Sequence, residues 1–304
     1  MFQRGAKPLS PRRTFFQSEH SLSLMCIPAV VLFLLFVIYP LASGVKISFT
    51  DWNGYSQKYH YIGLENYKTM FTDNKFRVAL KNTFIYGVVG TILQTIIGFV
   101  YALFLNNKFV GRTLTRTIIY MPVMIAHILI GYIWYFMVQY DRGAINDILT
   151  LFGMNQIDWM GDPTRAVWMI TIINTVSCVG VSMIILLAGL QGISRSFFEA
   201  AMIDGASSFQ TVRYITIPQL VPAFTTSIIL NLISGLKIFG LVIAMTAGGP
   251  GYASHSLTTL INWTYFSNQN AGYAATIGLT SFIIIMVISL FTHKLIQKGG
   301  GEYN

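Results

Sequence analysis

Long apolar runs, separated by short polar segments, dominate the hydropathy pattern of the chain. A membrane-spanning helix needs about 20 mainly apolar residues. Windows of that length lie at residues 24–45, 83–106, 117–140, 166–190, 220–247 and 273–292. Their apolar faces extend all the way round a helix, and the alternation of a membrane β-barrel is absent. The pattern therefore predicts an all-α polytopic membrane protein with six transmembrane helices.

Composition supports this class and excludes others. Only 10% of the 304 residues are charged, whereas soluble proteins carry about 25%, and the mean hydropathy is +0.58. So few charges cannot cover a water-facing surface. This excludes a nucleic-acid-binding protein despite the net charge of +9, and it disfavours a cytosolic enzyme. The two cysteines, Cys26 and Cys178, lie in apolar runs and offer no disulfide framework or zinc cluster.

Basic residues indicate the orientation of the chain, because cytoplasmic segments of membrane proteins are enriched in lysine and arginine. The N-terminal tail carries Arg12 and Arg13, and the loop after the second window carries Lys108, Arg112 and Arg116 without an acid. The loop after the first window also contains lysines, whereas aspartates outnumber basic residues after the third. We predict that both termini are cytoplasmic.

The segment between the fourth and fifth windows has the pattern of two short helices outside the bilayer. Ser196 and Glu199 have the spacing of a capping box, in which serine caps a helix start and the acid reaches back. Gly205 can adopt the left-handed conformation that ends this helix, and Ser207 or Ser208 can cap the second. The pattern predicts a helix-turn-helix with small alanines on one side, where another protein can approach closely. The alternative is a mere connector, although connectors this long and well capped are usually functional.

The same segment resembles a known signature. Its runs Glu199-Ala200-Ala201, Asp204-Gly205-Ala206 and Ile215-Thr216-Ile217-Pro218 are similar to the EAA loop of ABC importer permeases. Further runs at residues 63–67, 111–122, 246–250 and 272–275 resemble motifs of the carbohydrate-uptake group, and especially of the larger membrane partner of the maltose importer. The chain departs from that partner by lacking its extra N-terminal spans and large outer domain. It also has Phe209 where many relatives have tryptophan.

The resemblance implies a domain plan and a set of partners. The plan has a basic cytoplasmic tail at 1–22, a six-helix permease domain at 23–298 with its EAA loop at about 192–222, and a short cytoplasmic tail at 299–304. Such a permease pairs with a second homologous permease in a heterodimer and binds two ATPase subunits. An external solute-binding protein delivers the sugar. The resemblance also implies a prokaryotic cell membrane, surrounding lipid, and no cofactor in this chain, because the ATPase subunits bind ATP and Mg.

Five residues of the loop are predicted to couple the permease to the ATPase. Glu199 either pairs with a basic residue of the ATPase, as the resemblance implies, or caps its own helix. Ala200 and Ala201 allow close docking, and Asp204 is either a coupling contact or a solvated turn residue. At Gly205 a side chain in the left-handed conformation costs about 1 kcal/mol or more.

A second set of residues is predicted to bind the sugar, through hydrogen bonds to hydroxyls and aromatic contacts. Helical spacing places polar residues on one face of the fourth window and on one face of the fifth. The resemblance places sugar contacts at His127, Asn174, Ser177, Cys178, Val181, Ser234, Gly235 and Ile238. The maltose importer's partner has aromatic rings where this chain has Val181 and Ser234. The alternative for each residue is an interhelical packing contact or hydrogen bond.

Lys237 is the only charged residue between Arg213 and Lys294. A lysine inside a membrane is costly unless it faces the bundle interior or a wet cavity. Two interpretations are open: Lys237 lines the pore and contacts sugar hydroxyls, or it makes a structural hydrogen bond. Relatives often have lysine in a similar run, so the residue does not imply an anionic substrate.

Two other transport classes are alternatives: an ABC permease for a solute other than a sugar, and a secondary transporter. A secondary transporter with its own ion coupling needs an intramembrane acid, and none of the six windows contains one. The sequence contains no Walker lysine motif, metal-ligand cluster or serine–histidine–acid constellation. We therefore predict no catalytic residues and no metal site in this chain.

Overall fold

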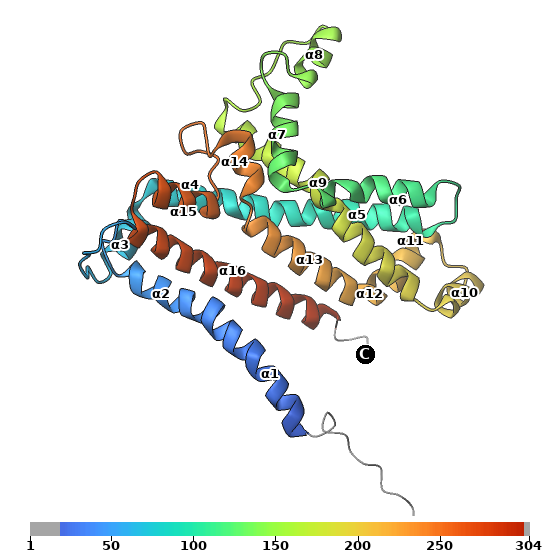
Figure 1. Cartoon of the computed structure of the whole chain (residues 1–304). Coiled ribbons are helices and arrows are strands. Elements are labelled where there is room, and N and C mark those ends of the chain that lie inside the picture. Colours follow the sequence, from blue (N-terminus) through green and yellow to red (C-terminus); the bar gives the residue numbers. More distant parts are fainter. Residues whose placement is uncertain (1–18, 301–304) are drawn as a thin grey trace, which may run out of the picture.

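The structure is a computed structural model that describes residues 19–300. Most of the predicted tails at 1–22 and 299–304 therefore lies outside the described residues. The described chain is almost entirely helical (Figure 1), which confirms the all-α prediction.

Four spans within residues 19–300 are long and apolar enough to cross a membrane: Cys26–Ser48, Asn74–Asn106, Pro163–Gly192 and Ala271–Ile296. They are built from α1 (Glu19–Phe33), the π-helical turn η2 (Leu34–Ile38), α2 (Tyr39–Ser48), α4 (Asn74–Phe84), the π-helical turn η3 (Ile85–Val89), α5 (Gly90–Asn106), α9 (Pro163–Gly192) and α16 (Ala271–Gly300). These spans correspond to the first, second, fourth and sixth apolar windows of the sequence.

The remaining two spans are bent. One joins α6 (Arg112–Tyr120) and the 3-10 turn η4 (Met121–Met124) to α7 (His127–Val138) with a bend of 99°. The other bends by 70° and comprises α11 (Ser208–Thr211), the π-helical turn η5 (Val212–Thr216), α12 (Ile217–Gln219) and α13 (Val221–Leu236). Prolines lie at both breaks, Pro122 in η4 and Pro222 in the first turn of α13. With each bent pair counted once, the described chain has up to six spans, as the sequence predicts.

One part of the fifth span differs from the prediction of a single helix over 220–247. α13 ends at Leu236, and the backbone leaves the helical conformation at Phe239, where φ is −136°. The chain then forms α14 (Gly240–Thr246), which packs on α7. Mean hydropathy does not mark this break, because Lys237 is a single charge within an otherwise apolar stretch.

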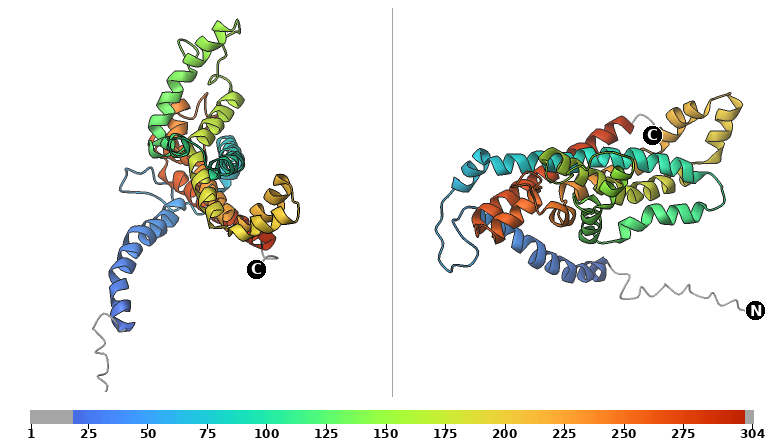
Figure 2. Two further views of the ribbon diagram at one scale, coloured as in Figure 1. Left: turned by 90° about the vertical axis from the view of Figure 1, so that its right-hand side faces the viewer. Right: turned by 90° about the horizontal axis from the view of Figure 1, so that it is seen from above.

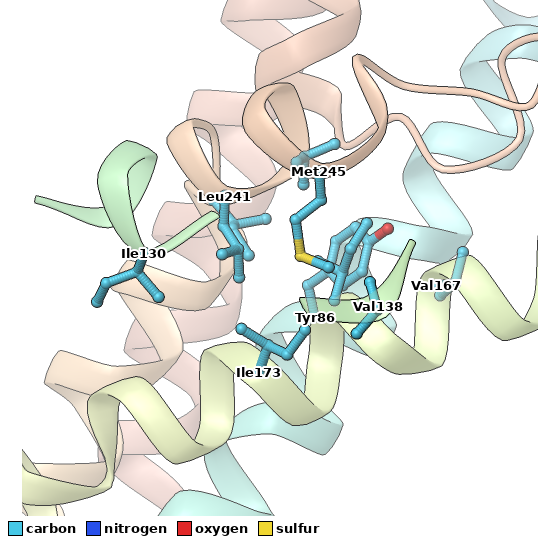
Figure 3. Close-up of a cluster of buried hydrophobic side chains, with 10 residues drawn as sticks. Tyr86, Ile130, Val138, Val167, Ile173, Leu241 and Met245 are labelled. Carbon is cyan, nitrogen blue, oxygen red and sulfur yellow. The ribbon is translucent and has the colours of Figure 1, made fainter. Parts of the chain in front are cut away.

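The core lies where α5 and α9 pack along each other. A cluster of buried apolar side chains from η3, α7, α9 and α14 fills one end, and Figure 3 shows Tyr86, Ile173, Leu241 and Met245 meeting there. A second cluster on α5 and α9, which includes Leu105 and Leu186, fills the other end.

The two ends of the bundle carry different elements. α3 (Glu65–Thr72) and α15 (Leu257–Phe266) lie at one end, whereas α10 (Arg195–Ile203) and α11 lie at the opposite end (Figure 1). α8 (Ala144–Leu151) lies at the tip of an arm that continues from α7. Buried Asn146 holds this arm together by donating to the carbonyl oxygens of Gln139 and Ile157, at 3.2 and 3.0 Å, and accepting from the Ile157 N–H.

The N-terminal arm, formed by α1, η2 and α2, leaves the rest of the bundle (Figure 2). No residue from Cys26 to Ile47 is buried, and Ser48 is the first buried residue of the arm. A groove of about 670 Å³ lies between α2, α15 and α16, and small residues such as Gly44, Ala275 and Gly278 line it.

Candidate functional site

A cavity of about 370 Å³ lies where α7 begins, where α13 ends and beside the middle of α9. It is lined by His127, Asn174, Ser234, Lys237, Ile238, Phe239, Gly240 and Leu241. Five of these residues belong to the predicted sugar-binding set. The two helix breaks, before His127 and after Leu236, place polar side chains and freed backbone at this point within the apolar bundle.

His127 and Asn174 are linked through Cys178. The Nε2 atom of His127 lies 3.3 Å from the Cys178 sulfur, and this thiol donates to the Asn174 side-chain oxygen at 3.8 Å. Asn174 and Cys178 lie one turn apart on α9 and are buried. No residue of the described chain accepts a hydrogen bond from the Asn174 amide nitrogen, and Asn174 itself lines the cavity.

Lys237 follows the last residue of α13, and its side chain is exposed at the cavity. Among residues 26–296, whose side chains the structure describes, the ion pairs are His60–Asp51 and Arg165–Asp162, so none of their carboxylates neutralises Lys237. The ammonium group can therefore donate to a ligand in the cavity.

Four predicted sugar-binding residues do not line this cavity. Ser177 donates to the Ile173 carbonyl oxygen at 2.7 Å within its own helix, and half-buried Val181 lies farther along α9. The Cys178 sulfur contacts the side chains of His127 and Asn174. Gly235 lies where α13 crosses η3, and a Cβ atom there would lie 2.8 Å from the Tyr86 carbonyl oxygen.

Three lining residues escaped the sequence reasoning: Phe239, Gly240 and Leu241. Gly240 directly follows the break and could have indicated it. The prediction of a continuous helix over 220–247 gave this glycine no structural role. Phe239 brings an aromatic ring, 37% exposed, to the cavity. It supplies a stacking surface that the sequence lacks at Val181 and Ser234.

The segment predicted to couple to the ATPase forms a helix-turn-helix at one end of the bundle (Figure 1). Gly205 has a φ of +70°, which confirms the left-handed stop of α10. The N–H of Ala206 donates to the Ala201 carbonyl oxygen at 2.9 Å, and Ser207 caps α11 through a capping box with Gln210. A cavity of about 290 Å³ fills the inner angle of the two helices and is lined by Asp204, Gly205 and Tyr214, among others.

The predicted capping box of Ser196 and Glu199 is wrong. α10 begins at Arg195, and Ser194 is its N-cap residue without a side-chain cap. Ser196 instead pairs with Ser194 through their hydroxyls at 2.8 Å. The helix starts two residues earlier than a Ser196 cap would place it, so Glu199 is not at the third helical position and does not face the N-cap. Glu199 is exposed, and the described chain gives its carboxylate no hydrogen-bond partner and no ion pair.

Large apolar side chains surround these coupling residues on the surface. Met202, Ile203 and Phe209 are 76%, 86% and 73% exposed, whereas Ala201 is buried. Ala200 is exposed on the same helix. Such a cluster at a polar end of a membrane protein is typical of a protein interface.

A polar cavity within a membrane bundle, an apolar docking loop at one end and spans without a single acid define a membrane transport component. The chain belongs to the family described as the binding-protein-dependent transport system inner membrane component, which matches residues 94–298. It is thus a multi-pass inner-membrane permease of a prokaryotic ABC importer that works with a binding protein. In this class ATP is bound by a partner ATPase subunit, and the permease itself is not an enzyme and holds no cofactor.

Curated relatives cover most of the chain. It is 31% identical over 272 residues to the trehalose/maltose transport system permease protein MalF of Thermococcus litoralis, covering 90% of this chain and 92% of that protein. It is 32% identical over 270 residues to the multiple sugar-binding transport system permease protein MsmF of Streptococcus mutans, covering 88% and 92%.

A solved structure shares the fold. A chain of a bacterial ABC transporter involved in the import of the acidic polysaccharide alginate superposes with a TM-score of 0.80 at 21% identity. The match covers 93% of this chain and 97% of that chain. The sequence prediction of an ABC importer permease fold is therefore confirmed.

Proposed function

We propose that this permease carries a sugar or oligosaccharide, delivered by an external solute-binding protein, through the cavity around Asn174 and Lys237. The cavity is the observation that carries the proposal. It combines an amide, a hydroxyl and an ammonium group with the ring of Phe239. Sugars require this combination, because their hydroxyls need hydrogen-bond partners and their C–H faces pack on aromatic rings.

Each group has a distinct part in this proposal. Asn174 and Ser234 donate to and accept from sugar hydroxyls, and Lys237 donates to a hydroxyl or ring oxygen. His127 and Cys178 hold Asn174 in position by hydrogen bonds. The absence of acids from the spans leaves ATP hydrolysis by the partner as the energy source, rather than an ion gradient. The sugar names of the trehalose/maltose and multiple sugar-binding relatives support the same substrate class.

The second permease of the proposed heterodimer packs in the groove between the N-terminal arm and α16. Two observations support this placement. The arm buries no residue from Cys26 to Ile47 in its own chain, and small residues line the groove, which allows a helix to approach closely. An apolar helix of a second permease would cover the exposed arm and fill the groove.

Two ATPase subunits bind from the cytoplasm, and one receives the helix-turn-helix of this chain. The free carboxylate of Glu199 and the exposed side chains of Met202 and Phe209 support this docking. The loop and both termini are then cytoplasmic, in agreement with the basic residues of the α5–α6 loop, which lies at the same end of the bundle (Figure 1).

Leucine substitutions in the cavity test the proposal. Asn174→Leu or Ser234→Leu removes a sugar hydrogen bond and fills the cavity, so sugar uptake and sugar-stimulated ATP hydrolysis should both fall about tenfold or more. The matched control is Val176→Leu, which adds bulk to the exposed face of α9 two residues away. Co-purification of the ATPase should be normal in all three variants.

The measurement uses vesicles that contain the full complex with its binding protein. Sugar uptake at the wild-type level in both cavity variants would place the substrate path elsewhere. Stimulation of hydrolysis by amino acids but by no sugar would favour the non-sugar alternative.

A further inference from the structure

Two arginines at the start of α6 have buried donors without acceptors. Arg112 and Arg116 lie four residues apart and thus share one face of α6. The Nε atom of each is inaccessible to solvent and has no hydrogen-bond partner. Leaving a buried donor unpaired costs about 1–3 kcal/mol, more when it is charged. Both arginines therefore need a hydrogen-bond acceptor from outside the described chain.

No acid near α6 can fill this role. None of α5, α6 and α9 contains an aspartate or glutamate, and the described ion pairs do not involve either arginine. Lys108 adds a third positive charge in the preceding loop. The cluster of Lys108, Arg112 and Arg116 is therefore an uncompensated basic site, which favours an anion with several acceptor oxygens.

The other side of α6 is apolar and exposed. Leu114, Ile118 and Met121 follow one another along that side and are exposed, and Val110 in the preceding turn is fully exposed. The partly buried Ile119 and Tyr120 pack on the apolar cluster of α5 and α9. The basic cluster thus lies beside apolar surface that suits acyl chains, at the end of the bundle that also carries α10 (Figure 1).

We propose that Lys108, Arg112 and Arg116 bind the phosphate of an anionic phospholipid headgroup in the cytoplasmic leaflet. Arginine binds phosphate through charge-assisted, often bidentate hydrogen bonds. Basic pockets between transmembrane helices on the cytoplasmic side bind anionic headgroups for the same reason. The choice of leaflet rests on the orientation given under the proposed function. The headgroup, bound at the start of α6, would hold the first half of the bent span whose second half begins at His127.

Native mass spectrometry of the complete transporter tests the proposal. The complex, purified in detergent, receives phosphatidylglycerol or phosphatidylcholine. Phosphatidylglycerol should be retained in preference to phosphatidylcholine, and retention should fall about tenfold or more in the double variant Arg112→Gln with Arg116→Gln. The control variant Arg213→Gln with Lys294→Gln removes the same charge from exposed positions and should retain the lipid as the wild type does.

Each remaining outcome overturns the proposal. Equal retention of the two lipids by the wild-type complex excludes an anionic headgroup site, whether or not the glutamine variants assemble. If the control variant loses as much phosphatidylglycerol as the Arg112 and Arg116 variant, lipid retention depends on net charge alone and not on this site. Displacement of phosphatidylglycerol by inorganic phosphate identifies a free anion as the ligand. The measurement uses no sugar, ATP or transport, so its failure is distinguishable from failure of the proposed function.

Discussion

Replacing Gly235 with alanine should destabilise the contact between α13 and η3. A Cβ atom at this position would lie 2.8 Å from the Tyr86 carbonyl oxygen and 2.9 Å from the Gly87 Cα atom. Both are backbone atoms and cannot rotate away. Ordinary contacts begin at 3.4 Å, so α13 must move by about 0.6 Å, the difference between 3.4 and 2.8 Å.

Overpacking of this size costs about 1–3 kcal/mol. For a chain longer than about 250 residues, each kcal/mol lowers the unfolding temperature by about 2 °C. The Gly235→Ala variant should therefore unfold about 2–6 °C below the wild-type complex. Because Ser234 and Lys237 flank this contact, sugar uptake should fall in the same variant.

Thermal unfolding of the purified complex, followed by tryptophan fluorescence, measures the effect. The matched control is Gly90→Ala, one turn from Gly87 on the opposing span, where the new Cβ would meet only the Asn174 amide at 3.9 Å. Alanine favours helix over glycine, so the control should be unchanged or slightly stabilised. Equal unfolding temperatures of the two variants would refute the close approach of α13 and η3.

Three further predictions concern the coupling loop, the orientation and pH. Gly205→Val forces a β-branched residue to a φ of +70°, so ATPase co-purification and transport should both fall while membrane insertion stays normal; wild-type co-purification would make the loop a passive connector. A cysteine at Ser207 should resist membrane-impermeant labelling in intact cells, and strong external labelling would invert the orientation. Burial and then the charge of Lys75 lower the pKa of His255. The stability from neutral His255 is therefore complete above about pH 6.5 and is lost as pH falls through the lowered pKa, so acidification should lower the wild-type unfolding temperature more than that of His255→Gln.

The sequence alone determined the membrane-spanning class, because the length and near absence of charge in an apolar window reflect bilayer thickness rather than any tertiary contact. Local signals in the coupling loop were equally informative. Gly205 marked a left-handed stop and Ser207 a helix start, since both depend on residues within one turn. The cap at Ser196 failed because Ser194 is an equally good local candidate, and short-range pattern does not choose between them.

Tertiary packing decided which predicted polar residues face the cavity. Helical spacing put Ser177 on the same face as Asn174, yet its hydroxyl returns to the Ile173 carbonyl oxygen, while Asn174 lines the cavity. The break after Leu236 depends on distant residues as well, because Gly131 of α7 lets α14 approach closely, with the Leu241 carbonyl oxygen 3.3 Å from where a Cβ atom would lie. Hydropathy records only how apolar a segment is. The turn of the chain at Phe239, which brings an aromatic ring into the cavity, is stabilised by contacts between helices far apart in sequence.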